Sequence, residues 1–307
     1  MKKLLLLVPF LFTPMAIEAE EVTPPAITET AIEAATEVAL TVEELQELIS
    51  QAAANLDEET VMISEAVEQE VLTSFDYLYS TQTFFQDISE ITNNDWNRYV
   101  TSIKEHRFGE SISSIFYVER IKDSDELAAF LQEVESRDNF SASNFPLVTS
   151  TDYNVDEPIF VTKFVAPETQ GRTRAVGQIV SSDSSSSLYR AIESNSIQLT
   201  NFFPYISSEQ TVAVAYLPIR NEIGEVQGAM AMSFRSHDFG DQLLQRIDLD
   251  NLTLEVNTRG IDNELTPVFT KYSRNTNNDQ IVATRAISIG GQIWEVTTIA
   301  DSYYGIS

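Results

Sequence analysis

Few residues in this chain have the types and spacing that catalysis or metal binding requires. The two histidines, His106 and His237, lie far apart, and neither has a neighbour at a metal-ligand spacing. Asp123, Asp125 and Glu126 resemble the start of a calcium loop, but the glycine and the closing glutamate of such a loop are missing. This acidic group is instead typical of a helix N-terminus.

Reactive nucleophiles are also lacking. The serines at 184–187 have no G-x-S-x-G around them and read as a helix cap and first turn. The chain has no cysteine, which excludes thiol catalysis, disulfides and thiolate metal sites. No glycine-rich phosphate loop is present. We therefore predict a protein that is not an enzyme and that carries no cofactor and no metal.

One pair of opposite charges stands where an apolar strand should finish. In "SISSIFYVERI", residues 111–121, alternation places Tyr117, Glu119 and Ile121 on one face of the strand and Arg120 on the other. Glu119 and Arg120 therefore cannot bind one ligand together. A salt bridge at the rim, worth about 0–1 kcal/mol, and a polar anchor both remain open, and the structural role is favoured.

Composition limits the partners of the protein. The 307 residues carry a net charge of -28, with 43% hydrophobic residues, which fits a globular chain of about two domains. Nucleic acid is excluded as a partner, because phosphate binding needs Lys and Arg. An anionic membrane surface would repel such a chain as well.

The N-terminus has the pattern of an export signal. Lys2 and Lys3 precede a short apolar run, Leu4–Phe12, and Ala19 ends a plausible cleavage site. We predict a signal peptide at 1–19 and a periplasmic or extracellular location. The alternative is an uncleaved segment that anchors the protein to the inner membrane. No later stretch is long and apolar enough to cross a bilayer.

The remaining chain divides into four parts. Residues 20–40 form an acidic leader that cannot bury enough apolar surface to fold. Residues 41–94 predict a helical stalk, one long helix or two in tandem, that starts at the capping box of Thr41 and Glu44. Residues 95–240 mix strands and helices, and residues 241–307 form a smaller, mostly antiparallel β unit. This order indicates the α+β class.

Within the mixed part, apolar runs bounded by turn residues predict strands at 111–121, 157–167, 174–182 and 197–203, and a hairpin at 211–236. Amphipathic spacing predicts helices at 123–137, 182–194 and 237–247. Asp123 or Ser124 would cap the first of these helices. Four more strands follow, at 252–260, 266–272, 281–289 and 292–300.

Seven segments stand together in the order and spacing of a known family. They are "DWNRYV", "SSIFYVERI", "VTKFVAP", "VGQIVSSDSSSSLYRAIES", "IQLT", "VAVAYLPIR" and "GEVQGAMAMSFRSHDF". From Asp95 to Phe239 the chain resembles the CHASE domain. This is the extracellular sensory module of histidine kinases and nucleotide cyclases, including the plant cytokinin receptors. The Tyr-x-Glu-Arg block at 117–120 is part of the family signature.

The resemblance implies a long dimerising helix, a membrane-distal PAS-like subdomain that binds small ligands, and a membrane-proximal PAS-like subdomain. Many members read Gly-x-Asp where this chain has Gly177, Gln178 and Ile179, and in cytokinin receptors an aspartate in this strand holds adenine. An adenine-type ligand is therefore not expected here. The inward faces of the matched strands give the ligand-binding candidates: Tyr117, Thr162, Phe164, Gln178, Leu199, Thr200 and Tyr216.

We thus expect an exported CHASE-type sensory module without its own output domain. A small molecule would bind the 95–240 subdomain and shift the long helix, with a homodimer formed through residues 41–91 and a membrane signalling partner beyond it. Two alternatives stay open. The chain could be a scaffold that uses the long helix for pairing, or a truncated fragment of a CHASE receptor kinase or cyclase.

Overall fold

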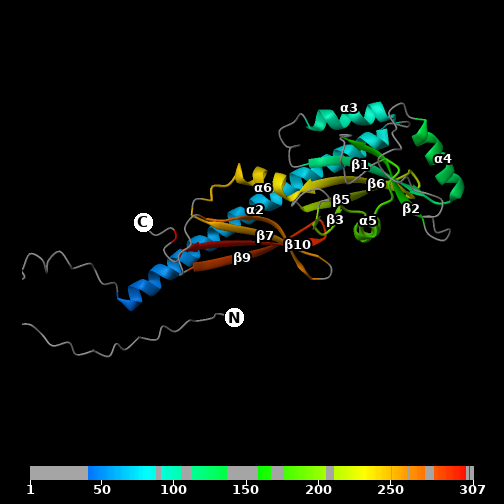
Figure 1. Ribbon diagram of the computed structural model, residues 1–307. Helices are drawn as coiled ribbons and strands as arrows, with labels where there is room; N and C mark the ends of the chain where they lie inside the picture. The colour runs from blue at the N-terminus through cyan, green and yellow to red at the C-terminus, as the bar shows by residue number, and fades with distance from the viewer. Residues whose placement is uncertain are drawn as a thin grey trace, which may run out of the picture. The chain divides into compact units, whose positions relative to one another are not determined.

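The computed structural model describes residues 41–87, 91–104, 112–136, 158–166, 176–204, 211–249, 251–260, 263–273, 280–301 and 304 (Figure 1). The predicted export signal and leader, residues 1–40, lie outside the described residues. The chain divides into two compact units, residues 1–45 and residues 46–307. In the first unit, Glu44 N donates to Thr41 Oγ1 at 3.2 Å and Thr41 N donates to Glu44 Oε2 at 2.8 Å. The predicted capping box is confirmed, and its hydrogen bonds lower the pKa of Glu44.

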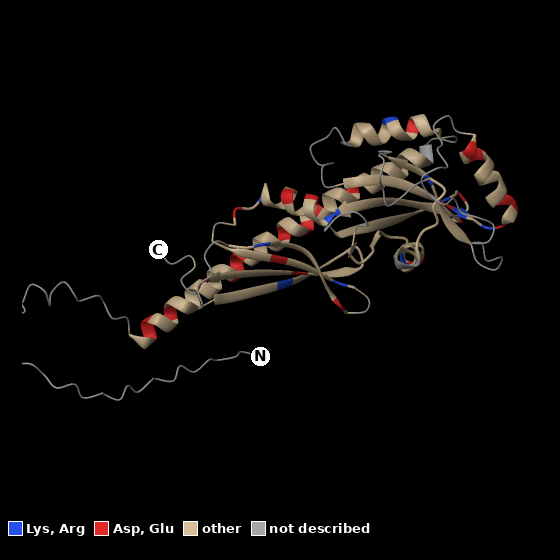
Figure 2. Cartoon of the chain, in the orientation of Figure 1, with Lys and Arg blue, Asp and Glu red and all other residues tan. Residues whose placement is uncertain are grey.

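Helix α2 (Val42–Asp87) is continuous over 46 residues, so the stalk is one helix and not two in tandem. It carries Asp and Glu but no Lys or Arg (Figure 2). The cations that pair with it come from elsewhere: Arg246 lies 3.0 Å from Glu70, and Arg285 lies 3.2 Å from Asp57. Its buried apolar side chains recur at helical spacing: Leu56, Ile63, Val67, Val71, Phe75 and Leu78. Packing, and not a ladder of ion pairs along the helix, stabilises α2.

The first sheet is antiparallel, with strand order β2-β1-β6-β5-β3 and with β4 paired to β5. Its strands are β1 (Ile112–Ile121), β2 (Ile159–Ala166), β3 (Gln198–Leu199), β4 (Phe203–Pro204), β5 (Thr211–Arg220) and β6 (Val226–Arg235). The predicted strand at 197–203 is therefore two short strands. Of the predicted strand at 174–182, the described part turns at Val176–Gly177 and makes a single bridge, from Ile179 to Val161.

Four helices accompany this sheet: α3 (Asn93–Lys104), α4 (Ser124–Glu135), α5 (Ser182–Ser194) and α6 (Ser236–Leu244). In α4, Asp123 Oδ1 accepts from Asp125 N at 3.0 Å and from Glu126 N at 2.8 Å, which confirms the predicted cap. Helix α3 was not expected, although Thr92 and Asp95 form a capping box at its start.

The second sheet is antiparallel, with order β8-β7-β10-β9. It contains β7 (Thr253–Arg259), β8 (Leu265–Lys271), β9 (Gln280–Ile289) and β10 (Gln292–Asp301), and a two-glycine turn joins the last two strands. The predicted α+β class, a long helix followed by two antiparallel β units, is confirmed. None of the described helices combines the length and the hydropathy that a membrane crossing requires.

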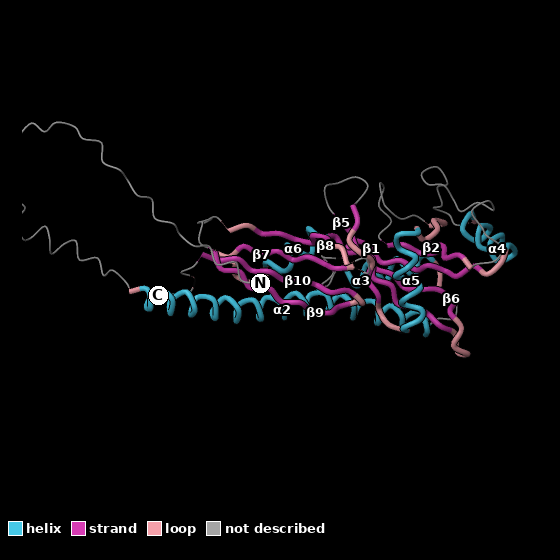
Figure 3. Tube along the Cα trace, turned by 90° about the horizontal axis from the view of Figure 1, so that it is seen from below, coloured by secondary structure: helices cyan, strands magenta, loops and turns pink. Residues whose placement is uncertain are grey.

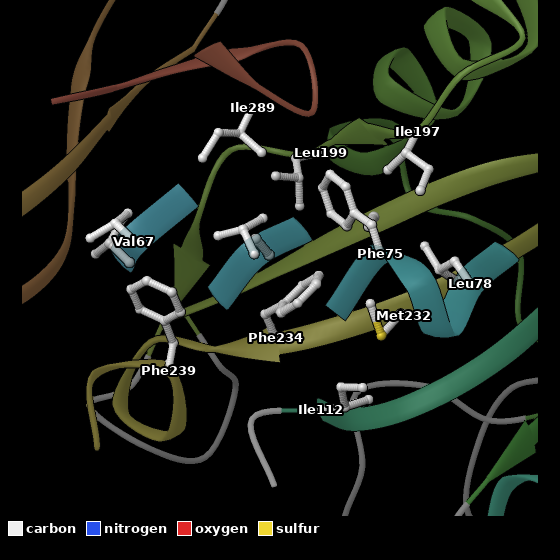
Figure 4. Packing of buried hydrophobic residues seen from close by; sticks show 14 of the residues in the cluster. Val67, Phe75, Leu78, Ile112, Ile197, Leu199, Met232, Phe234, Phe239 and Ile289 are labelled. Carbon is white, nitrogen blue, oxygen red and sulfur yellow. The ribbon is translucent and has the colours of Figure 1, made fainter. Parts of the chain in front are cut away.

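Two clusters of buried side chains lie on opposite faces of the first sheet. The main cluster joins α2, the first sheet and the second sheet, as the side-by-side course of α2 and the strands indicates (Figure 3). Phe75 of α2 lies beside Leu199, and its ring centroid is 6.3 Å from that of Phe234 (Figure 4). The second cluster joins the other face to α5 through Leu188 and Ala191. We call these the α2 face and the α5 face of the sheet.

Candidate functional site

The central strand β6 has large side chains on one face and small ones on the other. Met230, Met232 and Phe234 belong to the main cluster on the α2 face. Ala229 and Ala231 belong to the second cluster on the α5 face. On the α5 face, these two positions of β6 therefore present only methyl groups, which occupy less space above the strand than the side chains on the other face.

A bulge in β2 redirects its side chains. Phe164 pairs with Tyr117 and Thr162 pairs with Val118, so Lys163 is one extra residue in the register between β2 and β1. Directly opposed residues share a face, so Thr162 lies on the α5 face with Val118, and Phe164 lies on the α2 face with Tyr117. Without the bulge, strict alternation along β2 would have placed Thr162 and Phe164 on the same face of the sheet.

Thr162 is fully buried, and its hydroxyl has no hydrogen-bond partner among the described residues. Its backbone is fully used: its N–H donates to Gln178 O at 2.9 Å, and its carbonyl accepts from Gly177 N at 2.8 Å. A buried hydroxyl without a partner costs about 1–3 kcal/mol, so such groups call for a specific explanation. Tyr216 shares this face and is fully buried, with its ring centroid 6.4 Å from that of Phe116 in an edge-to-face arrangement.

The structure distributes the seven predicted ligand-binding residues over both faces. Thr162 and Tyr216 lie on the α5 face, and the backbone of Gln178 borders Thr162. The other four lie elsewhere: Tyr117, Phe164 and Leu199 belong to the main cluster, and the hydroxyl of Thr200 accepts from Val214 N at 2.9 Å.

Leu199 is a junction between α5 and the second sheet, which the sequence did not reveal. Its carbonyl accepts from Ser187 Oγ at 2.9 Å, from an Arg190 guanidinium nitrogen at 3.3 Å and from Gln292 Nε2 at 3.4 Å. Its N–H donates to Gly290 O at 2.8 Å. The Arg190 guanidinium also donates to the carbonyl of Gly291. Burial lowers the pKa of this guanidinium.

The α2 face contains a cleft of about 970 Å³ near the ends of β1 and β2. Its floor is aromatic: Phe85 of α2 lies 4.6 Å from the Tyr117 ring and 6.0 Å from the Phe164 ring, between centroids. Burial, with a smaller contribution from Glu119, raises the pKa of the Tyr117 hydroxyl. This hydroxyl donates to Gln227 O at 3.3 Å.

Lys163 crosses one wall of the cleft. Its ammonium group lies 2.9 Å from Glu119 and 3.1 Å from Glu133, and 6.0 Å from the centre of the Phe164 ring. Glu119 therefore pairs across the strands with the bulged lysine and not with its neighbour Arg120. The bulge makes this contact possible because it turns Lys163 toward the Tyr117 side of the sheet.

Across the described residues, no group of His, Asp and Glu is arranged to hold a metal ion.

The family model described as the CHASE domain matches residues 89–269. No curated protein matches the chain.

Solved structures with similar folds include three ligand-binding domains of bacterial chemoreceptors. The amino acid chemoreceptor PctC of Pseudomonas aeruginosa PAO1, in complex with GABA, is 12% identical with a TM-score of 0.47, over 81% of this chain and 99% of that one. CtaA of Pseudomonas fluorescens, in complex with L-isoleucine, is 11% identical with a TM-score of 0.47, over 83% and 94%. Tlp3 of Campylobacter jejuni, in complex with L-valine, is 12% identical with a TM-score of 0.45, over 86% and 99%.

Proposed function

The chain belongs to the CHASE domain family, and on that premise we propose that it is an exported sensory module that binds a small molecule on the α5 face of its first sheet. The family match covers every strand of this sheet and α5. Ligand binding would change the position of α2, and a homodimer formed through α2 would pass the change to a membrane partner.

One observation carries the choice of face: the buried Thr162 hydroxyl, which has no hydrogen-bond partner among the residues that the structure describes, lies beside the small side chains of β6. A ligand over Ala229 and Ala231 could hydrogen-bond this hydroxyl and cover Tyr216. Among the residues predicted from the sequence, Thr162, Gln178 and Tyr216 are our binding candidates. Thr200 instead supports β5, since its hydroxyl and its N–H both bond the backbone of Val214.

A signal from this face has a physical route to the long helix. Ser187 and Arg190 of α5 hold the Leu199 carbonyl, and the Leu199 N–H holds the β9–β10 turn. Leu199 also packs beside Phe75 of α2 (Figure 4). A ligand that moves α5 relative to the sheet would therefore shift contacts to both the second sheet and α2.

The test compares two buried threonines. Purified protein is screened by thermal shift against amino acids, nucleobases and small organic acids, and hits are measured by calorimetry. A ligand at a hundred times its dissociation constant adds about 2.7 kcal/mol to the folded state. Thr162→Val should leave the ligand-free protein as stable or more so, because it removes a buried hydroxyl that no described residue pairs with. The same change should weaken binding about tenfold.

Thr200→Val is the matched control. It removes a hydroxyl that has a partner and leaves the Val214 N–H with one acceptor fewer, so it should lower stability by about 1–3 kcal/mol. Ligands that bind equally well to Thr162→Val and to the wild type would argue against this face as the site. No hit across the panel would argue against small-molecule sensing.

One observation favours a second function, the scaffold that pairs through its long helix. Helix α2 exposes Met62, Leu72 and Tyr79, at 55%, 41% and 48%, within an arc of about 100°. Sedimentation of the double variant Met62→Glu, Leu72→Glu tests this function. Loss of self-association with ligand binding unchanged would favour a sensor whose dimer is separable. Loss of self-association in a protein that binds no ligand would favour the scaffold.

A further inference from the structure

The cleft on the α2 face is separate from the α5-face site of the proposed function, because the first sheet lies between them. Its floor is made by Phe85, Tyr117 and Phe164, which come from α2, β1 and β2. Tyr117 and Phe164 are almost fully buried, at 6% and 2% exposure, and their rings are tilted by 31° to each other. A volume of about 970 Å³ is ample for a small organic molecule.

The walls above this floor contain more acceptors than cations. Among the described residues, four carboxylates line the cleft: Glu119, Glu126, Glu133 and Glu225. Three basic residues line it too, but Arg120 pairs with Phe160 of the second cluster, so strand alternation places its side chain on the α5 face. Four carboxylates therefore face two ammonium groups, those of Lys122 and Lys163.

Both ammonium groups already contact these carboxylates. Lys163 lies between Glu119 and Glu133, and Lys122 Nζ is 3.9 Å from Glu225. A further acceptor, Asn93 Oδ1 at the start of α3, is buried in the cleft wall and has no partner among the described residues. An occupant that donates hydrogen bonds and carries positive charge would satisfy these groups.

We propose that this cleft is a second binding site, for a small organic cation in which an ammonium group is attached to an aromatic or branched apolar group. The apolar part lies on the Phe85, Tyr117 and Phe164 rings. The ammonium group binds near Glu119, Glu133 and Asn93, where ring faces and carboxylates attract the same charge. Because Phe85 belongs to α2, the occupant contacts the long helix directly, without the route through α5.

Calorimetry with three probes of similar shape tests the charge preference in the purified protein. Phenethylammonium should bind, whereas 2-phenylethanol and 3-phenylpropionate should bind at least about tenfold more weakly, the factor that one charge-assisted hydrogen bond provides. Equal binding of the three probes, a preference for the anion, or no detectable binding of phenethylammonium would each overturn the proposal.

Two variants test the position of the charge. Glu119→Gln should weaken phenethylammonium binding about tenfold. Lys163→Met removes the cation that competes for Glu119 and Glu133, so it should strengthen phenethylammonium binding several-fold. If Lys163 only supported the structure, its loss would not strengthen binding. Glu58→Gln, an exposed change on α2, is the control for net charge and should leave binding unchanged.

The second site is also distinguished from the first by variants. Thr162→Val should leave phenethylammonium binding unaltered, and Glu119→Gln should leave binding of an α5-face ligand unaltered. If Thr162→Val abolishes phenethylammonium binding in a protein of unchanged stability, the cation occupies the α5 face and the second site is wrong. Weaker binding to Lys163→Met would refute the proposed charge preference.

Discussion

Replacing Gly290 by alanine tests how the second sheet is held against the rest of the protein. Gly290 and Gly291, with φ of 59° and 73°, form the two-residue turn between β9 and β10. An added Cβ at Gly290 would lie 2.7 Å from Leu199 Cδ1 and 3.1 Å from Phe75 Cζ. Leu199 is 1% exposed and cannot move into solvent to make room.

The expected cost has two parts. An alanine in the left-handed region costs about 1–2 kcal/mol. Forcing one more carbon into the packed contact with Leu199 and Phe75 costs about 1–3 kcal/mol more. Gly290→Ala should therefore lower the free energy of unfolding by about 2–5 kcal/mol. Gly224→Ala is the matched control: its φ is 85°, and no atom lies within 4 Å of the added Cβ.

Urea unfolding of the two variants and of the wild type gives both free energies. The strain is common to both variants, so their difference, about 1–3 kcal/mol, reports the close approach of the turn to Leu199 and Phe75. Ligand affinity on the α5 face should also fall in Gly290→Ala, since Leu199 connects the turn to α5. Equal losses of stability in the two variants would refute the packing of the turn on Leu199.

Three further predictions concern the orientation of α2, the cap of α4 and the buried carboxyl of Glu70. Leu78→Ala should cost about 2–5 kcal/mol, whereas Leu72→Ala on the exposed side of α2 should change stability by less than about 0.5 kcal/mol, and similar losses in urea unfolding would contradict the helix orientation. Asp123→Ala should cost about 0.5–2 kcal/mol, because two N–H groups of α4 lose their acceptor, and an unchanged unfolding midpoint would contradict the cap. Burial raises the pKa of the Glu70 carboxyl, against the attraction of Arg246. The folded state therefore favours the protonated carboxyl, and the contribution of Glu70 to stability is present at low pH and is lost as pH rises through its folded pKa. Glu70→Gln should accordingly gain in stability relative to the wild type as pH rises from about 4, and a difference that is constant with pH would argue against this sign.

Local patterns were sufficient for the two predicted helix caps and for the alternation of β6. The capping box at Thr41 and the cap at Asp123 depend on side chains within three residues of the N–H groups that they bind. The alternation in β6, with Met230 and Met232 on one face, follows from strand geometry alone. The seven family segments depend on order and spacing, which the sequence contains completely.

The placement of the binding candidates could not be derived in the same way. A bulge at Lys163 changes the phase of β2, so Thr162 and Phe164 lie on opposite faces although the alternating pattern assigns them to one. Nothing in the local sequence specifies a bulge of this kind, because it is set by the register with β1. Helix α3 was missed for a different reason: its capping box, Thr92 and Asp95, is local, but its short amphipathic stretch comes soon after the much longer helical pattern of α2.

The sequence by itself determined the α+β class, the long helix, the family and the export-type N-terminal pattern, because each depends on residue types at fixed local spacing. Only the tertiary structure decided which residues meet. It brought Glu119 to Lys163 across two strands and joined Leu199 to Gly290 and Gln292. It also left the Thr162 hydroxyl on the α5 face without a hydrogen-bond partner in the described part of the chain. These contacts join residues far apart in the chain, and they exist only because packing fixes the register and the approach of the two sheets.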